Sequence, residues 1–378
     1  MGTGSPFSSI QVASVVRPHA QVRDQIRAMI LSGELAPGTR LPTTRELAVS
    51  SGTSIKTVHR ALADLAKEGL LIRTRGSGTF VRERSVKLTN VGLYFPYDPW
   101  GGDELSYQRA LVTALKKLGA EHGLRISNWI DPRPLAEQGE PWCELVQAIQ
   151  TSQIDGLICP LVDWPHLNWL DKLQIPRVFS ASVPQPRCLD ANLSQLAQLS
   201  VQAAVDQGAR SIGIISPLGI DGQHPDGLPD PAQDFYLEFI SEARAKGLTV
   251  HNEWVLTGKD EDGSRDQKMW GYHRMHDLWS QSAHPEALVV YPDTAAEGVI
   301  TALLELGVRV PQDLKLVLHK NDETPLLCPM PAEFIVLSLR DVAAALIDAV
   351  EAQFYGKPHA IKPSGFSRQG SPAMQKTQ

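Results

Sequence analysis

The segment from residue 17 to residue 85 constrains the fold more than any other part of the chain, because it combines helical patterns with a basic, glycine-tipped hairpin. It carries 12 lysines and arginines against 6 aspartates and glutamates, a net charge of +6. The whole chain of 378 residues has a net charge of −6, so the remainder sums to −12. A small basic module on a large acidic body is expected where only one part contacts phosphate. This charge distribution predicts an N-terminal domain that binds DNA.

Local signals within the segment predict three helices. Apolar side chains recur at helical spacing over residues 19–32. A second, short helix is expected after Thr43, which would cap it, with Glu46 as the capping-box partner three residues later. Ser54 is expected to cap a third helix that runs to about residue 68. Three helices in this order are what a helix-turn-helix needs.

The third helix and the hairpin after it offer surfaces for DNA. The apolar stripe of the helix leaves its N-terminal end polar, with Ile55, Lys56, Thr57, His59 and Arg60 exposed there. Residues 70–73 and 79–82 predict two short strands, and Gly76 and Gly78 at the tip permit positive φ and a close approach to a sugar–phosphate strand. The alternative is a solvated helical hairpin with a basic surface, but the order of elements favours a recognition helix and a basic wing.

This module closely resembles the winged helix-turn-helix of GntR-family regulators. The matching stretches are Gly38-Thr39-Arg40-Leu41-Pro42, Arg45-Glu46-Leu47-Ala48, Thr57-Val58, Arg60-Ala61-Leu62, Glu68-Gly69-Leu70 and Gly76-Ser77-Gly78-Thr79-Phe80-Val81. The resemblance implies DNA contacts from Thr44, Arg45, Ser54, Lys56, Thr57, His59, Arg60, Arg75, Gly76, Ser77 and Gly78. Arg45 would contact phosphate, and Arg75 with Gly76 would enter the minor groove. Ile55 stands where relatives often carry arginine, so their operator preference does not transfer.

The rest of the chain alternates between strand and helix patterns. Predicted strands are 91–96, 124–130, 154–160, 177–180, 211–216, 249–255, 287–291 and 315–318, and predicted helices are 105–122, 141–153, 165–174, 192–207, 232–246, 268–282, 294–306 and 340–355. Such repetition predicts an α/β fold with parallel sheets covered by helices, long enough for two lobes. The expected domains are a disordered tail (1–16), a winged helix-turn-helix (17–82), a linker (83–90), a two-lobed effector-binding and dimerisation domain (91–366) and a second tail (367–378).

The second part resembles the effector-binding domain of LacI-type repressors, which has the periplasmic-binding-protein type 1 fold. The resemblance rests on Val91-Gly92-Leu93-Tyr94, Asp155-Gly156-Leu157-Ile158, Gln207-Gly208-Ala209-Arg210, Tyr291-Pro292-Asp293-Thr294 and Gly307-Val308-Arg309-Val310-Pro311. Fused to a GntR-type head, it resembles an arabinose-repressor type of architecture. Two departures concern the ligand: the sequence 231–235 lacks the arginine that grips sugar hydroxyls in the family, and 319–322 replaces a glycine-tyrosine-aspartate segment.

Ligands of such sheets bind beyond the carboxyl ends of the strands. Residues there that suit a carbohydrate are Tyr94, Tyr97, Trp100, Trp164, Asp221, Asp293, His319 and Asn321. The alternative for the aromatic residues is core packing, and for Asp293 it is a helix N-cap. His273 and His276 lie three apart on a helix, but without a nearby cysteine or paired carboxylate a solvated face is favoured over a metal site.

These features together predict a ligand-responsive transcription regulator, a repressor, that binds operator DNA as a homodimer and senses a sugar or sugar derivative. No catalytic constellation, cofactor or metal is expected. The alternative is a GntR-headed aminotransferase-like enzyme with pyridoxal phosphate, but the body has few lysines and no glycine-rich phosphate cup. The N-terminus lacks a secretory signal pattern, no apolar run is long enough for a membrane, and the four cysteines are widely spaced, so we expect a cytoplasmic protein with reduced thiols.

Overall fold

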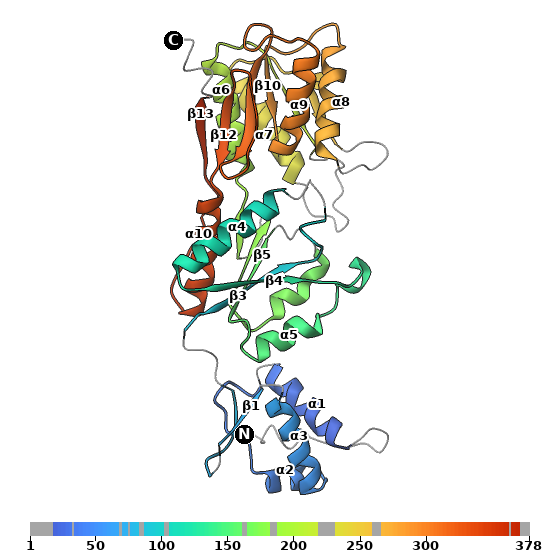
Figure 1. Ribbon diagram of the computed structural model, residues 1–378, viewed down its shortest axis with the longest axis vertical. Coiled ribbons are helices and arrows are strands. Elements are labelled where there is room, and N and C mark those ends of the chain that lie inside the picture. The colour runs from blue at the N-terminus through green and yellow to red at the C-terminus, as the bar shows by residue number, and fades with distance from the viewer. Residues whose placement is uncertain are drawn as a thin grey trace. The chain divides into compact units, whose positions relative to one another are not determined.

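A computed structural model describes most of the chain (Figure 1). The described residues are 18–31, 34–67, 70–74, 76–82, 87–101, 106–160, 165–181, 187–217, 231–258, 266–362 and 364–370. The expected N-terminal tail (1–16) lies outside these residues, as do residues 83–86 of the expected linker.

The N-terminal head is built from three helices and a two-stranded wing. In chain order its elements are α1 (Pro18–Leu31), α2 (Thr44–Ser50), α3 (Ile55–Lys67), β1 (Leu71–Thr74) and β2 (Gly78–Val81) (Figure 1). The capping box predicted for α2 is confirmed. The backbone N–H of Glu46 donates to Thr43 Oγ1 at 3.2 Å, and the backbone N–H of Thr43 donates to Glu46 Oε2 at 2.7 Å. These two bonds satisfy N–H groups that the start of a helix leaves open.

One apolar core holds the head together. Its buried side chains are Val22, Ile26, Met29, Leu35, Leu41, Leu47, Ala48, Val58, Ala61, Leu62, Leu65, Leu70, Leu71 and Val81, which come from all three helices and both strands. On α3, Val58, Leu62 and Leu65 recur at helical spacing, so one face of the helix is buried and the opposite face is exposed. Packing therefore fixes α3 while leaving its polar face available.

A five-stranded sheet forms the first half of the body. Its strands are β3 (Asn90–Phe95), β4 (Arg125–Ile130), β5 (Gly156–Pro160), β6 (Arg177–Ala181) and β7 (Cys188–Asp190), in the order β4–β3–β5–β6–β7. The connecting helices are α4 (Ser106–Glu121), η3 (Leu135–Glu137), α5 (Cys143–Gln150) and η4 (Pro165–Lys172). Asp155 fixes the start of β3, because its Oδ2 accepts from the backbone N–H groups of Thr89 at 3.2 Å and Asn90 at 3.0 Å.

A six-stranded sheet forms the second half. Its strands are β8 (Ile212–Ser216), β9 (Val255–Thr257), β10 (Ala287–Val290), β11 (Lys315–Asn321), β12 (Glu333–Leu337) and β13 (Phe366–Gly370), in the order β13–β12–β11–β10–β8–β9. All neighbouring strands are parallel except β13, which pairs with β12 antiparallel. The helices are α6 (Leu193–Asp206), α7 (Pro231–Ala245), η5 (Asn252–Trp254), α8 (Gln267–Trp279) and α9 (Asp293–Glu305). The predicted parallel α/β architecture is confirmed.

The last helix, α10 (Leu339–Phe354), packs against α4 and β6 of the first half rather than against the second sheet. Arg340 NH2 pairs with Glu121 Oε2 at 2.9 Å. The side-chain amide of Gln353 bonds the backbone of Arg177 in both directions, donating to its carbonyl at 2.8 Å and accepting from its N–H at 3.2 Å. The chain thus leaves the second sheet after β12 and returns to it as β13.

Two glycines allow α8 and α9 to lie in close contact. A Cβ on Gly298 would lie 1.8 Å from the backbone oxygen of Lys268, and one on Gly271 would lie 2.3 Å from that of Ala295. Any side chain at these positions would therefore push the helices apart.

The structure corrects several sequence predictions. The strand expected at 249–255 is wrong: only Thr249 forms a bridge there, η5 follows, and β9 begins at Val255. Helix 165–174 is a 3-10 helix, η4. The strand expected at 315–318 extends to Asn321, because residues 319–321 continue the parallel pairing with β12. Strands β7, β12 and β13 were not predicted, and β13 occupies the first part of the expected C-terminal tail.

Candidate functional site

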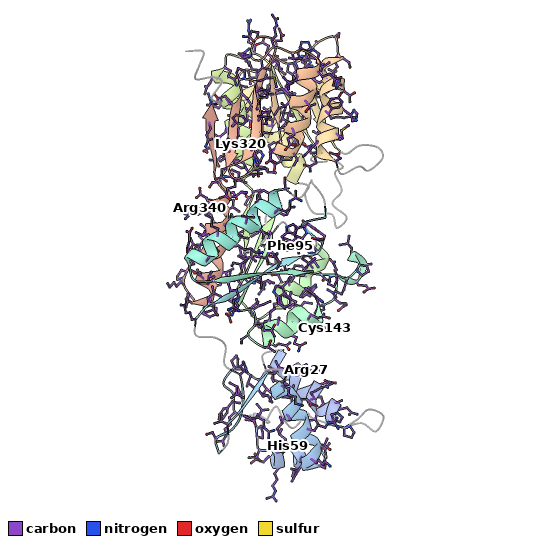
Figure 2. All side chains as sticks on the ribbon, viewed as in Figure 1. Arg27, His59, Phe95, Cys143, Lys320 and Arg340 are labelled. Atoms are coloured by element: carbon purple, nitrogen blue, oxygen red, sulfur yellow. The ribbon has the colours of Figure 1, made fainter. Side chains whose placement is uncertain are left out.

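The N-terminal end of α3 presents polar side chains on a rigid helix. The backbone N–H of Thr57 donates to Ser54 Oγ at 3.1 Å, and the two hydroxyls lie 2.8 Å apart, so Ser54 caps the helix as predicted. Lys56, His59 and Arg60 are exposed around this end (Figure 2 labels His59). A positively charged, capped helix end that projects from a packed core has the geometry of a major-groove reader.

The second helix adds a further cation. Arg45 is exposed on the first turn of α2, next to the half-buried Thr44. The capping box of Thr43 and Glu46 fixes the start of α2 and therefore the position from which Arg45 projects.

The wing supplies a tight, glycine-based tip. Gly76 has φ +83° and Gly78 has φ +124°, as their place in the hairpin predicts. Ser77 is exposed between them, while Arg75 lies outside the described residues. The absence of a side chain at Gly78 leaves room for the guanidinium of Arg40, whose Nε would lie 3.0 Å from a Cβ placed there.

The structure adds Arg73 to the candidate DNA contacts. Arg73 is exposed on β1, and its NH1 lies 3.5 Å from Nε2 of His59 on α3. The sequence offered no signal for this proximity, because the two residues belong to different elements and only the packed core brings them together.

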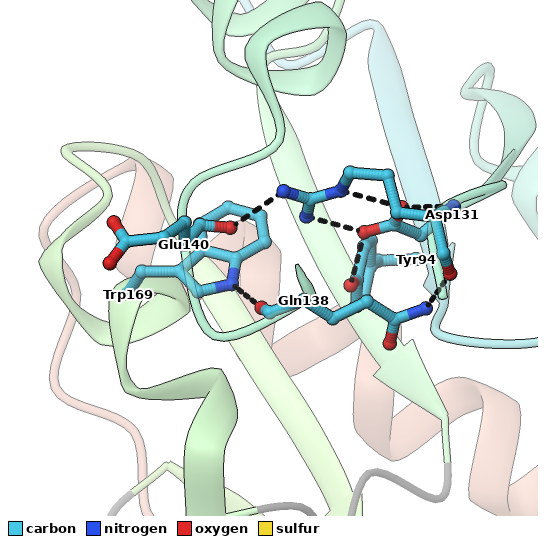
Figure 3. Close-up of polar contacts among 6 residues, drawn as sticks. Tyr94, Asp131, Gln138, Glu140 and Trp169 are labelled. Atoms are coloured by element: carbon cyan, nitrogen blue, oxygen red, sulfur yellow. Dashed lines mark hydrogen bonds and ion pairs between the residues drawn. The ribbon is translucent and has the colours of Figure 1, made fainter. Parts of the chain in front are cut away.

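In the body, Tyr94 belongs to a buried polar network rather than to an open surface (Figure 3). Its hydroxyl donates to Asp131 Oδ2 at 3.1 Å, and the same carboxylate binds Arg133 through Nε at 2.9 Å and NH2 at 2.7 Å. The Asp131 side chain is fully buried. Burial raises the pKa of Asp131, but the hydrogen bonds and charge of Arg133 outweigh it and hold the pKa below its usual range.

Backbone groups extend this network. Arg133 NH1 donates to the carbonyl of Glu140 at 3.0 Å, and its own carbonyl accepts from the side-chain amide of Gln138 at 2.9 Å. Trp169 Nε1 donates to the carbonyl of Gln138 at 2.8 Å, and its ring packs edge-on against Tyr94. Figure 3 shows these contacts linking three separate segments of chain. The arrangement stabilises the fold. No local pattern in the sequence indicates that Asp131 and Arg133 belong to it.

A second buried polar group lies at the carboxyl end of the six-stranded sheet. Asn321, the last residue of β11, donates its side-chain amide to Asp293 Oδ2 at 2.9 Å. Asp293 is the first residue of α9, and its Oδ1 accepts from the backbone N–H of Thr294 at 3.1 Å. The N-cap position itself is Pro292, so Asp293 is not the N-cap considered as its alternative role. The end of β11 and the start of α9 thus bring Asn321 and Asp293 together.

His319 lies beside this pair. It is 4% exposed, and its ring lies 4.8 Å from that of Tyr291 and 5.9 Å from that of Phe366. Neither ring nitrogen has a hydrogen-bond partner among the described residues, and Asn321 Oδ1 also has none. Burial lowers the pKa of His319 to about 4, although the charge of Asp293 acts in the opposite direction. A neutral imidazole with two unused nitrogens is suited to bind a ligand that donates and accepts hydrogen bonds.

Two tyrosines that the sequence analysis did not select belong to the same surroundings. Burial raises the pKa of Tyr291, and the charges of Tyr107 and Asp293 add to the rise. Burial likewise raises the pKa of Tyr107 to about 12, although a hydrogen bond with Ser180 lowers it in part. Both phenols are therefore neutral at physiological pH. Tyr107 lies on the first turn of α4, and the helical pattern of this segment gives no indication that the residue lies near Tyr291.

The other residues predicted to bind the ligand are not grouped with Asp293, His319 and Asn321 by any described contact. Tyr97 lies within 3.5 Å of the Gln108 amide, and Trp100 is half exposed and packs edge-on against Phe95. Trp164 and Asp221 lie outside the described residues. The three predicted residues that the structure groups are therefore Asp293, His319 and Asn321.

The pair of histidines on α8 does not gather metal ligands in the part of the chain that the structure describes. His276 Nε2 lies 3.6 Å from Glu305 Oε2, and its ring packs against Tyr272. No group of three or more histidine, cysteine, aspartate or glutamate side chains suited to a metal occurs among the described residues.

Two family models match separate parts of the chain. Residues 18–81 match the bacterial regulatory proteins of the gntR family, and residues 201–365 match the periplasmic binding protein-like domain. The HTH-type transcriptional repressor PurR of Pectobacterium atrosepticum is 34% identical over 117 residues, which are 31% of this chain and 30% of that repressor. The chain thus covers less than a third of this relative. The arabinose metabolism transcriptional repressor of Halalkalibacterium halodurans is 21% identical over 316 residues, 78% of each chain.

Solved structures share the fold. The transcription regulator CcpA of Lactococcus lactis has a TM-score of 0.54 at 14% identity, over 75% of this chain and 98% of that one. A LacI regulator from Lactobacillus casei has a TM-score of 0.55 at 20% identity, over 75% and 97%. No described helix has both the length and the apolar character that crossing a membrane requires. The chain thus joins a DNA-binding domain of the gntR family to a periplasmic binding protein-like domain with the fold of LacI-type regulators.

Proposed function

We propose that this chain is a transcription regulator whose head binds operator DNA and whose body binds a small, hydroxylated effector of the carbohydrate kind. The proposal rests on two groups of side chains with different chemistry on one chain. The exposed cations of α2, α3 and β1 suit phosphate, and the buried group of Asp293, His319 and Asn321 offers unused hydrogen-bonding atoms.

The matched relatives support a repressor as the form of regulation. PurR and the arabinose metabolism repressor are both named as transcriptional repressors. The LacI regulator of Lactobacillus casei has been solved with glucose and with sucrose. We propose that this chain likewise blocks transcription and that a sugar or sugar derivative changes its affinity for DNA.

We further propose that the regulator acts as a homodimer in the cytoplasm. One winged head contacts too few base pairs for a long operator, whereas a symmetric pair reads two half-sites. The DNA contacts proposed for each head are Thr44, Arg45, Ser54, Lys56, Thr57, His59, Arg60, Arg75, Gly76, Ser77 and Gly78.

The test selects duplexes from a random pool with the full-length protein and then measures affinity over a range of salt concentrations. A regulator should select an inverted repeat, and its affinity should fall steeply with salt. A thermal-shift screen of sugars then seeks ligands that raise the melting temperature. Failure to bind any selected duplex in a salt-dependent way would refute the DNA-binding part, and an unchanged melting temperature with every sugar would refute the effector part.

A further inference from the structure

The side chain of Asp293 is a buried carboxylate without a cationic partner. It is 3% exposed, and its oxygens accept from two neutral donors, the backbone N–H of Thr294 and the amide of Asn321. No lysine or arginine of the described residues forms an ion pair with it. By contrast, the buried carboxylate of Asp131 is paired with Arg133. A buried charge is normally paired, so the unpaired Asp293 needs an explanation.

The start of α9 compensates for only part of this charge. Asp293 is the first residue of the helix, where the partial positive charge of the helix end favours an anion. However, its Oδ1 accepts only the adjacent N–H of Thr294 and none from the next residues of the first turn. Each carboxylate oxygen can accept a second hydrogen bond, so the group retains capacity for a further donor.

His319 does not neutralise Asp293 either. Burial lowers the pKa of this imidazole to about 4 despite the nearby carboxylate, so the ring is neutral at physiological pH. Tyr291, whose ring packs against His319, and Tyr107, which acts electrostatically on Tyr291, are neutral as well, because burial raises their pKa values. His319 and the two tyrosines therefore add no charge beside the Asp293 side chain.

The unused atoms of this group are mostly acceptors. Asn321 Oδ1 has no partner, and a neutral His319 offers one nitrogen as acceptor and one as donor. The spare acceptor capacity of Asp293 adds to these. An ammonium group brings three donors and a positive charge, and the rings of Tyr291 and Phe366 beside His319 are surfaces on which a cation is tolerated.

We propose that the effector carries a protonated amine that pairs with Asp293, so that its class is an amino sugar or amino polyol rather than a neutral sugar or a sugar phosphate. The inference rests on the proposed function, because it specifies the ligand of the same site. Asp293 Oδ1 and Oδ2 accept from the ammonium group, and His319 and Asn321 Oδ1 bind hydroxyls of the same molecule.

The experiment uses the full-length protein and calorimetry with matched ligands. Each amine is compared with an uncharged counterpart: glucosamine with glucose, galactosamine with galactose, and Tris with glycerol. Glucose 6-phosphate is the anionic ligand. At least one amine should bind about tenfold or more tightly than its counterpart, as a hydrogen-bonded charge pair implies. Asp293→Asn keeps the shape and removes the charge, and it should reduce this preference to less than about threefold. Asp277→Asn, an exposed change on α8, should leave it intact.

A second measurement does not depend on the choice of ligand. If Asp293 is held in place for a cation, the ligand-free Asp293→Asn protein should melt at a higher temperature than the wild type, because an uncompensated charge is removed. A lower melting temperature would show that Asp293 serves α9 alone and would overturn the inference. Tighter binding of a neutral or phosphorylated sugar than of every amine would also overturn it, while leaving the proposed regulator intact. Absence of binding to all ligands would instead count against the effector function itself.

Discussion

His59 Nε2 on the third helix lies 3.5 Å from Arg73 NH1 on the first strand of the wing. The helix and the wing therefore present polar side chains side by side, although 13 residues separate them in sequence. Because both elements contribute side chains to the same apolar core, their packing maintains this arrangement. It extends the proposed DNA surface from the helix end onto the wing strand.

Replacement of Arg45 by alanine should weaken operator binding and reduce the slope of log affinity against log salt by about one, since one phosphate contact is lost. The measurement is fluorescence anisotropy of a labelled duplex at several salt concentrations. Lys67→Ala, at the opposite end of α3, removes the same charge and should leave the slope unchanged. Equal slopes for wild type and Arg45→Ala would remove Arg45 from the interface.

Replacement of Arg73 by alanine should also lower operator affinity, and Arg73→Lys should restore much of it if the contact is to phosphate. The reason is the position of Arg73 beside His59, on the exposed side of β1. A phosphate contact predicts a loss of about one in the salt slope for Arg73→Ala. If affinity is unaffected at every salt concentration, Arg73 only supports His59 or faces solvent.

Features set by residues close together in the sequence could be predicted, whereas features set by residues far apart in the sequence could not. The cap of α2 could be predicted because Thr43 and Glu46 lie three residues apart and their pattern has a single physical meaning. β13 could not, because Phe366–Gly370 is a largely exposed edge strand without an apolar run. The pairing of Asp293 with Asn321 depends on two parallel strands and a helix start that meet only in the folded chain. The position of both residues at strand ends could be predicted, but nothing in the sequence indicated that the Asp293 side chain lacks a cationic partner.

Thr43→Ala should destabilise α2 by about 1 kcal/mol, because the start of the helix loses its capping box. The full-length chain has several domains, so the measurement is hydrogen exchange of a peptide that covers α2, which should become faster. Thr43→Ser should behave like the wild type.

The stability of α2 should also depend on pH. Hydrogen bonds from Thr43 lower the pKa of Glu46, with the larger effect from the backbone N–H and the smaller from the hydroxyl. Protection of α2 should therefore be complete above the ordinary pKa of a glutamate and decline as the pH falls through the lowered pKa of the folded state.

Gly298→Ala should destabilise the body by at least about 1–3 kcal/mol, the usual cost of overpacking, because the added methyl would meet the backbone of α8. Urea denaturation followed by tryptophan fluorescence measures this change. Gly365→Ala is the matched control, since nothing lies within 4 Å of a Cβ at that position. Similar midpoints for the two variants would mean that α8 and α9 are not in the close contact described here.

The effector should change operator affinity through the chain segment that joins the head to the body. A typical coupling is about 1–3 kcal/mol, and linkage requires DNA to change effector affinity by the same factor. The sequence 83–90, ERSVKLTN, is shorter and poorer in glycine and serine than a free tether, so a conformational change in the body should reach the head. Operator affinity is measured with and without saturating effector, in the wild type and in a variant with a long glycine-serine insert after Ser85. The insert should abolish the effect of the effector while leaving effector binding itself unchanged. An equal shift in both proteins would mean that the signal passes by another route, such as a change in dimerisation.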